Sequence, residues 1–159
     1  MITEPSIRVR AGVQTIVCLN GRILLGQRKN VFHKDSWGLP GGQVDRHLKP
    51  GGTLIEVGVH KLYEETGLVA TRAELSCITD PTPASNYHMQ IGILVLDFEG
   101  TPHIKQPDFC SKLDFFPLDN LPEPIFVGSV DIIRNYTEGV LYRGSYRPVI
   151  MDSRAPRWC

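Results

Sequence analysis

The sequence lacks an excess of charge of either sign. It contains 17 lysines and arginines and 17 aspartates and glutamates among 159 residues, so its formal net charge is zero. A protein that binds duplex nucleic acid needs a basic surface to neutralise the phosphates. We therefore expect no duplex nucleic-acid partner.

Long apolar runs and paired cysteines are missing as well. No apolar run approaches the roughly 20 residues that a membrane helix needs, so we expect no membrane partner. The first ten residues, MITEPSIRVR, lack the apolar segment of a secretory signal. Without a Cys-x-x-Cys pair a zinc site is not expected. A chain of this length can build a core without disulfides, so we expect a cytoplasmic protein whose cysteines are free thiols; they are Cys18, Cys77, Cys110 and Cys159.

The composition is that of an ordinary globular chain, with 42% hydrophobic and 21% charged residues. We expect one domain over residues 1–159, with a core at about 8–137 and a C-terminal tail at 138–159. Alternating apolar residues in 7–19, then Asn20-Gly21, then 22–28 predict a hairpin with a type I′ turn. Further strands are predicted at 37–39, 73–79, 87–98 and 113–118.

Two helices are predicted. The first begins at Thr53, where Glu56 completes a capping box, and ends at Gly67. Its expected apolar stripe is Ile55, Val59, Leu62 and Thr66, and its expected open side carries Val57, His60, Lys61, Glu64 and Glu65. The second spans 127–137, with Val130, Ile133 and Tyr136 facing the core. Strands, helix, strands and helix in this order predict an α+β fold, an α/β/α sandwich with a mixed sheet.

The stretch 37–68 concentrates the residues that could carry chemistry. Its glycine turns let backbone N–H groups approach an anion, and a helix N-terminus adds a positive dipole end. The adjacent carboxylates of Glu64 and Glu65 could hold Mg²⁺, which takes oxygen ligands and shares them with phosphates. Together these features favour metal-assisted phosphate chemistry.

The same stretch resembles a known signature. Residues 62–68, LYEETGL, match the second half of the Nudix box, U-x-E-E-x-G-U, in which U is a bulky aliphatic residue. Residues 37–45, WGLPGGQVD, match the usual approach to that box, and the strand LLGQR at 24–28 precedes it as in the family. The chain thus resembles the Nudix (MutT-like) hydrolase superfamily. Its nearest likeness is to the subgroup that hydrolyses nucleotides and prenyl diphosphates.

The box is nevertheless degenerate. About four residues, 47–50, are inserted before the helix, and Gly52 stands where the first motif glutamate belongs. His60 stands at the motif arginine, and Lys61 stands at a glutamate that the family uses as a central metal ligand. On a helix Lys61 neighbours both Glu64 and Glu65, so its ammonium can pair with them. It could also bind a diphosphate itself as a point charge.

The resemblance implies a set of site residues. Glu64, Glu65, Lys61 and His60 are the expected catalytic residues, and Glu64 and Glu65 the expected ligands of Mg²⁺. Substrate contacts are expected from the strand before the box, from the glycine turn and from two later segments. These residues are Arg28, Leu39, Gly41, Gly42, Asp45, Tyr87 and Phe126. A homodimer is expected from the resemblance alone.

Three functions stay open. The first is a hydrolase with a reduced metal site that cuts the diphosphate linkage of a nucleoside diphosphate derivative or a prenyl diphosphate. The second is a different enzyme on the same fold, such as an isomerase, lyase or cyclase that needs no metal. The third is an inactive domain that binds or senses a ligand. Function resides in the site, so the fold alone does not choose among them.

Overall fold

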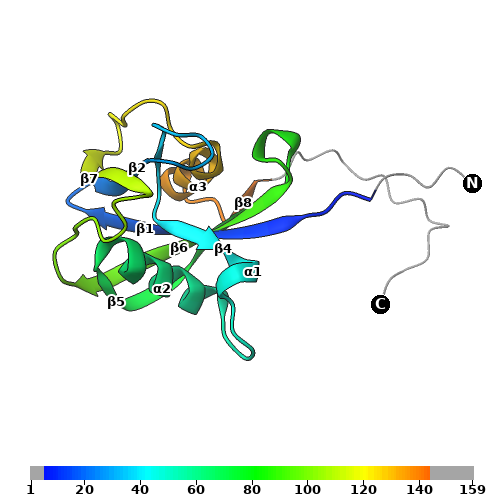
Figure 1. The fold of residues 1–159 in the computed structure, drawn as a ribbon, viewed down its shortest axis with the longest axis horizontal. Coiled ribbons are helices and arrows are strands. Elements are labelled where there is room, and N and C mark those ends of the chain that lie inside the picture. Colours follow the sequence, from blue (N-terminus) through cyan, green and yellow to red (C-terminus); the bar gives the residue numbers. More distant parts are fainter. Residues whose placement is uncertain (1–5, 144–159) are drawn as a thin grey trace, which may run out of the picture.

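The computed structural model describes residues 6–143 of the chain, which form a mixed sheet with a helix on each side (Figure 1). The strands are β1 Arg10–Leu19, β2 Arg22–Arg28, β3 Trp37–Gly38, β4 Gly41–Gln43, β5 Val69–Thr79, β6 His88–Glu99, β7 Cys110–Pro117 and β8 Tyr142–Arg143. The helices are α1 Val44–His47, α2 Leu54–Thr66, the single 3-10 turn η1 Pro83–Ser85 and α3 Val127–Glu138. Residues 144–159, most of the expected C-terminal tail, lie outside this range.

Strand β1 is the centre of the sheet. It pairs parallel with β6 over eight residues and antiparallel with β2 and with β4. Strand β6 in turn pairs antiparallel with β5, so the sheet is mixed, as predicted. The turn between β1 and β2 has positive φ at both Asn20 (51°) and Gly21 (73°), which confirms the predicted type I′ hairpin.

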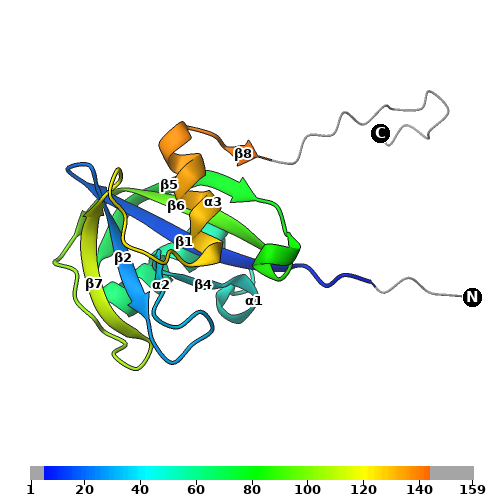
Figure 2. The ribbon, with the colours of Figure 1, turned by 90° about the horizontal axis from the view of Figure 1, so that it is seen from above.

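The two longer helices cover opposite faces of the sheet, α2 below the strands and α3 above them in Figure 1. On one face α2 comes so close that a Cβ added at Gly58 would lie 2.9 Å from Val13 Cγ1 and 3.1 Å from Ile93 Cγ1. On the other face, a Cβ at Gly92 would lie 3.2 Å from the Ile132 side chain of α3. Because side chains alternate along a strand, the odd-numbered residues of β1 face α2, and the even-numbered residues of β6 face α3. This is the predicted α/β/α sandwich, seen from above in Figure 2.

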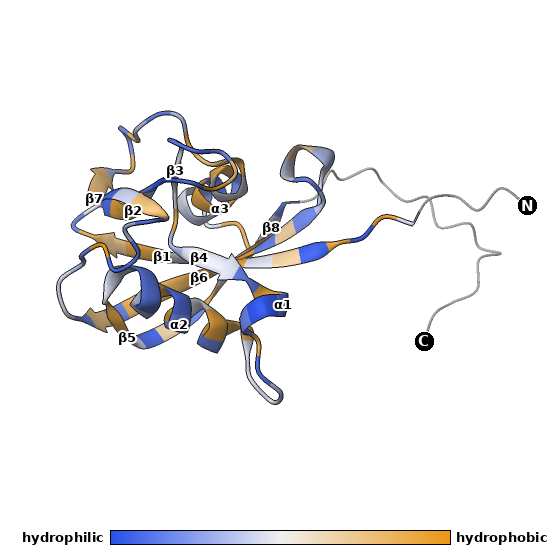
Figure 3. Ribbon diagram, viewed as in Figure 1, coloured by the Kyte–Doolittle hydropathy of each residue, from blue (hydrophilic) through white to orange (hydrophobic). Residues whose placement is uncertain are grey.

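Each face of the sheet has its own hydrophobic core. Colouring by hydropathy shows the central strands mostly apolar and the outer sides of α1 and α2 polar (Figure 3). The α3 side is built on Ile16, Ile23, Leu25, Trp37, Leu39, Cys77, Ile132 and Ile133. The α2 side is built on Val13, Val17, Leu24, Val57, Leu62, Leu68, Ile91, Ile93 and Val95. The centre of β6, from Gln90 to Ile93, is buried on both faces, as its apolar sequence indicated.

The expected apolar stripes of both helices were partly wrong. Helix α2 has its predicted capping box and its left-handed C-cap at Gly67, but it buries Val57 (3% exposed) and Lys61 (8% exposed). Both had been expected on the open side. Lysine is rarely buried unless its charge is paired, so the prediction failed because two partners, described below, compensate the ammonium. Helix α3 buries Ile132 with Ile133 and leaves Val130 46% exposed, because Gly128 and Ser129 face the sheet.

Several boundaries also differ from the prediction. Strand β1 begins at Arg10 rather than residue 7, and β5 begins four residues earlier than expected. The short helix α1 was not predicted. It ends at His47, the first of the inserted residues 47–50, and a turn follows at Pro50 and Gly51, where Gly51 has φ 76°. Within residues 6–143, no helix is long and apolar enough to cross a membrane. The three cysteines in this range, Cys18, Cys77 and Cys110, are free thiols.

Candidate functional site

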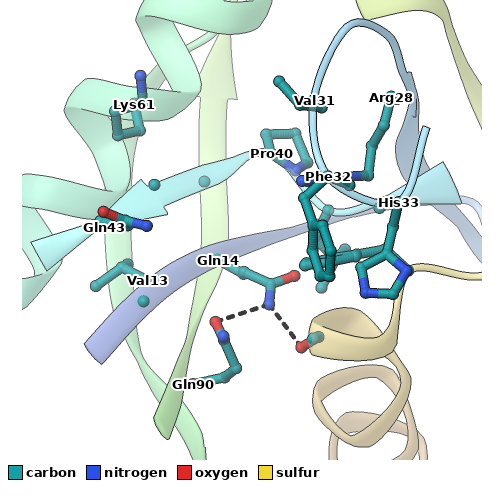
Figure 4. A pocket seen from close by; sticks show the side chains of 18 of the residues that line it. Val13, Gln14, Arg28, Val31, Phe32, His33, Pro40, Gln43, Lys61 and Gln90 are labelled. Carbon is teal, nitrogen blue, oxygen red and sulfur yellow. Dashed lines mark hydrogen bonds between the residues drawn. The ribbon is translucent and has the colours of Figure 1, made fainter. Parts of the chain in front are cut away.

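A cavity of about 900 Å³ runs from α2 past the glycine-rich strand β4 to the N-terminus of α3. Its walls come from segments far apart in the sequence, including β1, β2, α2, η1 and the start of β6. Figure 4 shows lining side chains from β1, β2, α2 and β6. Concave sites of this size that combine apolar walls with a few polar groups are typical of small-molecule binding. We therefore take this cavity as the candidate site.

Lys61 occupies the α2 end of the cavity. Its Nζ lies 2.9 Å from Glu64 Oε2 and 3.6 Å from Glu65 Oε1, so one ammonium binds both carboxylates. The other oxygen of Glu64 lies 2.9 Å from His60 Nε2. The lysine stem passes directly over Gly42, where an added Cβ would lie 2.9 Å from Lys61 Cε. A side chain at position 42 would therefore push the lysine stem aside.

The two carboxylates have different protonation behaviour. The hydrogen bond from Lys61 holds the pKa of Glu64 below its ordinary value. Burial raises the pKa of Glu65 to about 7, although Lys61 and the N–H of Gly41, which donates to Glu65 Oε2 at 3.1 Å, act in the opposite direction. A carboxyl group that titrates near neutral pH is suited to accept or release a proton during catalysis.

A cation and an aromatic ring form the opposite wall. The guanidinium carbon of Arg28 lies 4.0 Å from the centroid of the Phe126 ring, a cation–π contact. Arg28 Nε also donates to the carbonyl of Phe32 at 3.0 Å, which ties the loop after β2 to this wall. Burial lowers the pKa of Arg28, and the nearby charge of Glu65 opposes that shift. Arginine stays protonated nonetheless and can bind an anion here.

Buried amides form the floor near α3. Gln14 Nε2 donates to Gln90 Oε1 at 3.0 Å and to the carbonyl of Gly128 at 2.6 Å. Ser129 Oγ donates to Gln14 Oε1 and accepts from the N–H of Leu39 at 3.1 Å. Figure 4 shows Gln14 at the centre of this arrangement, with dashed lines to Gln90 and to the first turn of α3.

The sequence profile of the NUDIX domain family matches residues 8–136, most of the chain. The chain belongs to the Nudix family. It is 33% identical over 125 residues to the ADP-ribose pyrophosphatase of Methanocaldococcus jannaschii, covering 78% of this chain and 70% of that protein.

Solved structures agree with the family assignment. The MutT NUDIX hydrolase from Burkholderia pseudomallei has a TM-score of 0.70 and 33% identity, covering 80% of this chain and 97% of that one. The NUDIX domain of Shewanella oneidensis NrtR, complexed with ADP ribose, has a TM-score of 0.67 and 23% identity, covering 82% and 88%. The hydrolases among these relatives support an enzyme of the hydrolase class.

Nudix hydrolases typically use divalent metal ions. In residues 6–143, however, no three histidine, cysteine, aspartate or glutamate side chains come together where they could hold one. The two box carboxylates, Glu64 and Glu65, are both bound by the Lys61 ammonium, which offers no lone pair to a metal. The residues present therefore do not fit a multi-ion centre.

The structure brings together seven of the eleven residues that the sequence singled out. Lining the cavity are Arg28, Leu39, Gly41, Gly42, Lys61, Glu65 and Phe126. His60 and Glu64 lie just outside it on the exposed side of α2, in contact with each other. They approach the site only through Lys61.

Asp45 and Tyr87 do not line the cavity. Asp45 is exposed in the first turn of α1, an element that the sequence did not predict. Tyr87 has φ 56° in the turn that precedes β6, so the strand begins at His88, which does line the cavity. Asp45 had been expected from its position in the family pattern, and Tyr87 from its place at the start of the predicted strand 87–98.

Sequence reasoning missed Gln14, Gln90 and Ser129, which form the floor of the cavity near α3 and are called the amide floor below. Gln14 and Gln90 are polar residues inside two otherwise apolar strands, and both are buried. Buried polar groups need hydrogen-bond partners, so such residues signal a polar network or a site. Only the parallel pairing of β1 with β6 shows that the two glutamines meet.

Proposed function

We propose that this Nudix protein hydrolyses the diphosphate linkage of a nucleoside diphosphate derivative, with ADP-ribose as the leading substrate. One observation carries the proposal. The cavity has cationic side chains on two walls, Lys61 on α2 and Arg28 on β2, and an aromatic ring, Phe126, in contact with Arg28. Cationic side chains suit the diphosphate, and an aromatic ring suits a base or sugar face.

The names of the relatives support this substrate class. An ADP-ribose pyrophosphatase is the curated relative described above, and the NUDIX domain of NrtR was solved with ADP ribose. A prenyl diphosphate shares the diphosphate, so it is the alternative substrate to include in the test. Hydrolysis of ADP-ribose at its diphosphate would yield two monophosphates.

The proposed reaction adds water across a P–O–P bridge. The water oxygen forms a bond to one phosphorus, the bridging P–O bond breaks, and the water proton passes to Glu65. Glu65 suits this role because its pKa of about 7 leaves a substantial ionised fraction at neutral pH. Lys61 and Arg28 neutralise the charge that accumulates on the phosphate oxygens. No step is assigned to a metal ion.

The second candidate function is ligand binding without turnover. It is favoured by Lys61, whose ammonium occupies the space between Glu64 and Glu65 and is itself bound by both. A base that is held in an ion pair is less available to a water molecule. The non-hydrolytic enzymes considered from the sequence have no comparable observation in their favour.

Turnover assays separate these functions. The full chain is incubated with ADP-ribose or a prenyl diphosphate, with Mg²⁺ or Mn²⁺ or with a chelator, and the products are resolved by ion-exchange chromatography. Formation of AMP that falls at least about hundredfold in Glu65→Gln supports the proposal. Glu74→Gln, an exposed carboxylate on β5, is the matched control and leaves the rate unchanged. Binding by calorimetry without any product would instead establish the second function.

A further inference from the structure

Two backbone groups determine which atoms of the amide floor donate hydrogen bonds and which accept them. The N–H of Leu39 can only donate, and it donates to Ser129 Oγ. The Ser129 hydroxyl must therefore use its own hydrogen elsewhere, and its partner is Gln14 Oε1. The carbonyl of Gly128 can only accept, so the nitrogen of Gln14 must face it, at 2.6 Å.

The second hydrogen of the Gln14 amide determines the orientation of Gln90. Because Gln14 Nε2 donates to Gln90 at 3.0 Å, the atom of Gln90 that accepts must be its oxygen. The NH₂ group of Gln90 is then the polar end left to the cavity, which Gln90 lines. Orientation of an amide is normally ambiguous, but here both ends of the chain of hydrogen bonds are backbone groups.

Gln90 and Lys61 address different parts of the cavity. Gln14 and Gln90 lie on the face of the sheet that carries α3, as the contact of Gln14 with Gly128 shows. Lys61 belongs to α2, which packs on the other face through Gly58 and Val13. Figure 4 shows Lys61 above strand β4 and the two glutamines below it, on either side of the glycine-rich strand. A ligand whose diphosphate lies at Lys61 therefore meets Gln90 with another of its groups.

The Gln90 amide occupies space that is free because position 12 has no side chain. Gly12 pairs with Gln90 across the parallel strands, and a Cβ added at Gly12 would lie 2.5 Å from Gln90 Oε1. Only a glycine lets the Gln90 amide lie against β1 where Gln14 can reach it. The hydrogen-bond network thus depends on the glycine at position 12 as well as on its own donors and acceptors.

We propose that Gln90 is a specificity-determining residue that donates from its NH₂ group to a hydrogen-bond acceptor on the nucleoside end of the ligand. Gln14 and Ser129 are positioning residues that keep the NH₂ group, rather than the oxygen, facing the ligand. The inference rests on the proposed function for the identity of the ligand, but it concerns binding and not hydrolysis.

The test compares two ligands that share phosphates but differ in the nucleoside. Affinities for ADP-ribose and for inorganic pyrophosphate are measured by calorimetry in full-length Glu65→Gln protein, so that turnover does not interfere. Adding Gln90→Leu removes the NH₂ donor without adding a charge that would repel either anionic ligand. We expect it to weaken ADP-ribose binding at least about three- to tenfold and to leave pyrophosphate binding within about twofold.

Two further variants guard against a purely structural effect. Gly12→Ala displaces the Gln90 amide without changing its chemistry, and Ser129→Ala removes the hydroxyl that orients Gln14. Each is expected to lower the affinity for ADP-ribose relative to pyrophosphate, whereas loss of folded protein would lower the apparent binding of both ligands together.

Equal losses for the two ligands, or no loss for Gln90→Leu, would overturn the inference. The outcome is separable from the test of hydrolysis. A chain that binds ADP-ribose through Gln90 but releases no AMP supports the inference and refutes the proposed reaction. A chain that releases AMP but binds ADP-ribose equally well with Gln90→Leu does the reverse.

Discussion

At the scale of single residues, Lys61 decides the character of the site. The sequence could predict its pairing with Glu64 and Glu65, because residues three and four positions apart adjoin on a helix. The structure adds that the lysine is buried and that its stem lies against Gly42. The positive charge is thereby fixed between two carboxylates instead of moving freely on the surface.

Replacing this lysine with a carboxylate tests what its charge does. Without metal, we expect Lys61→Glu to lower the free energy of unfolding by about 3–5 kcal/mol, since it removes the partner of two carboxylates and adds a third. Carboxylates at positions 61, 64 and 65 would lie within about one turn of α2 and would resemble a cation site, so Mg²⁺ or Mn²⁺ should raise the melting temperature of the variant.

Thermal unfolding with metal and with chelator provides the measurement. The unchanged chain is the control, and its melting temperature is expected to move by less than about 1 °C with either metal, because no suitable cluster exists in residues 6–143. If the melting temperature of the variant does not change with metal, position 61 is not part of a potential metal site. If metal-dependent hydrolysis also rises, Lys61 had been suppressing it.

Glu65 gives the protein a characteristic pH dependence. Its pKa in the folded chain is raised from 4.5 to about 7, so the folded state binds its proton more tightly than the unfolded state. The resulting stabilisation is fully present below pH 4.5 and is lost as the pH rises through about 7. It amounts to at most about 3 kcal/mol.

Urea unfolding between pH 4.5 and pH 8 measures this effect. The unfolding free energy of the unchanged chain minus that of Glu65→Gln should fall as the pH rises, because glutamine does not titrate. Other groups titrate in both proteins and cancel in the difference. A difference that stays constant over this range would mean that burial does not raise the pKa of Glu65.

At the scale of the elements, hairpin, strands and helix ends were predictable because local chemistry determines them. Asn20-Gly21 specifies its turn, and Thr53 with Glu56 specifies the start of α2. The buried faces of α2 and α3 were less predictable. Their rotation depends on where small residues and hydrogen bonds let the helix approach the sheet, which is a property of the packed pair and not of either sequence.

Gly58 is where α2 approaches the sheet most closely. Alanine has the better helix propensity by about 1 kcal/mol, but its Cβ would lie 2.9 Å from Val13 Cγ1 and 3.1 Å from Ile93 Cγ1. We expect Gly58→Ala to lower the unfolding free energy by about 1–3 kcal/mol through this overpacking.

A double variant provides the control. Val13→Ala removes the nearer methyl groups, so Gly58→Ala should cost less, or even stabilise, in the Val13→Ala background than in the unchanged chain. Urea unfolding of the four proteins gives the coupling. Equal costs in both backgrounds would show that the contact across this interface does not limit the size of residue 58.

At the scale of the whole molecule, the sequence predicted the family fold and the region of the site but not its second face. Residues 37–68 carried the recognisable signature, and all of them belong to β3, β4, α1, α2 and their connections. The amide floor comes from β1, β6 and α3, which are separated by more than a hundred residues between Gln14 and Ser129. Such a long-range meeting has no periodic or local pattern to reveal it.

A ligand that spans both faces should change the protein on both faces. We expect ADP-ribose to slow amide hydrogen exchange around β4 and also in the first turn of α3. Pyrophosphate should protect the β4 region alone, because it lacks the group that meets Gln90. Exchange measured by mass spectrometry on the full chain distinguishes the two patterns. Identical patterns for both ligands would confine binding to one side of the sheet.

The homodimer and the single-domain organisation stay predictions.

The contact of Lys61 with Gly42 also restricts how this chain could have diverged. A side chain at position 42 would push the lysine stem aside, whereas a glycine there accommodates either a lysine or a shorter residue at position 61. A substitution at position 42 should therefore cost least after the lysine has been replaced. As long as the lysine is kept, we expect position 42 to stay a glycine, so the order in which the two positions change matters.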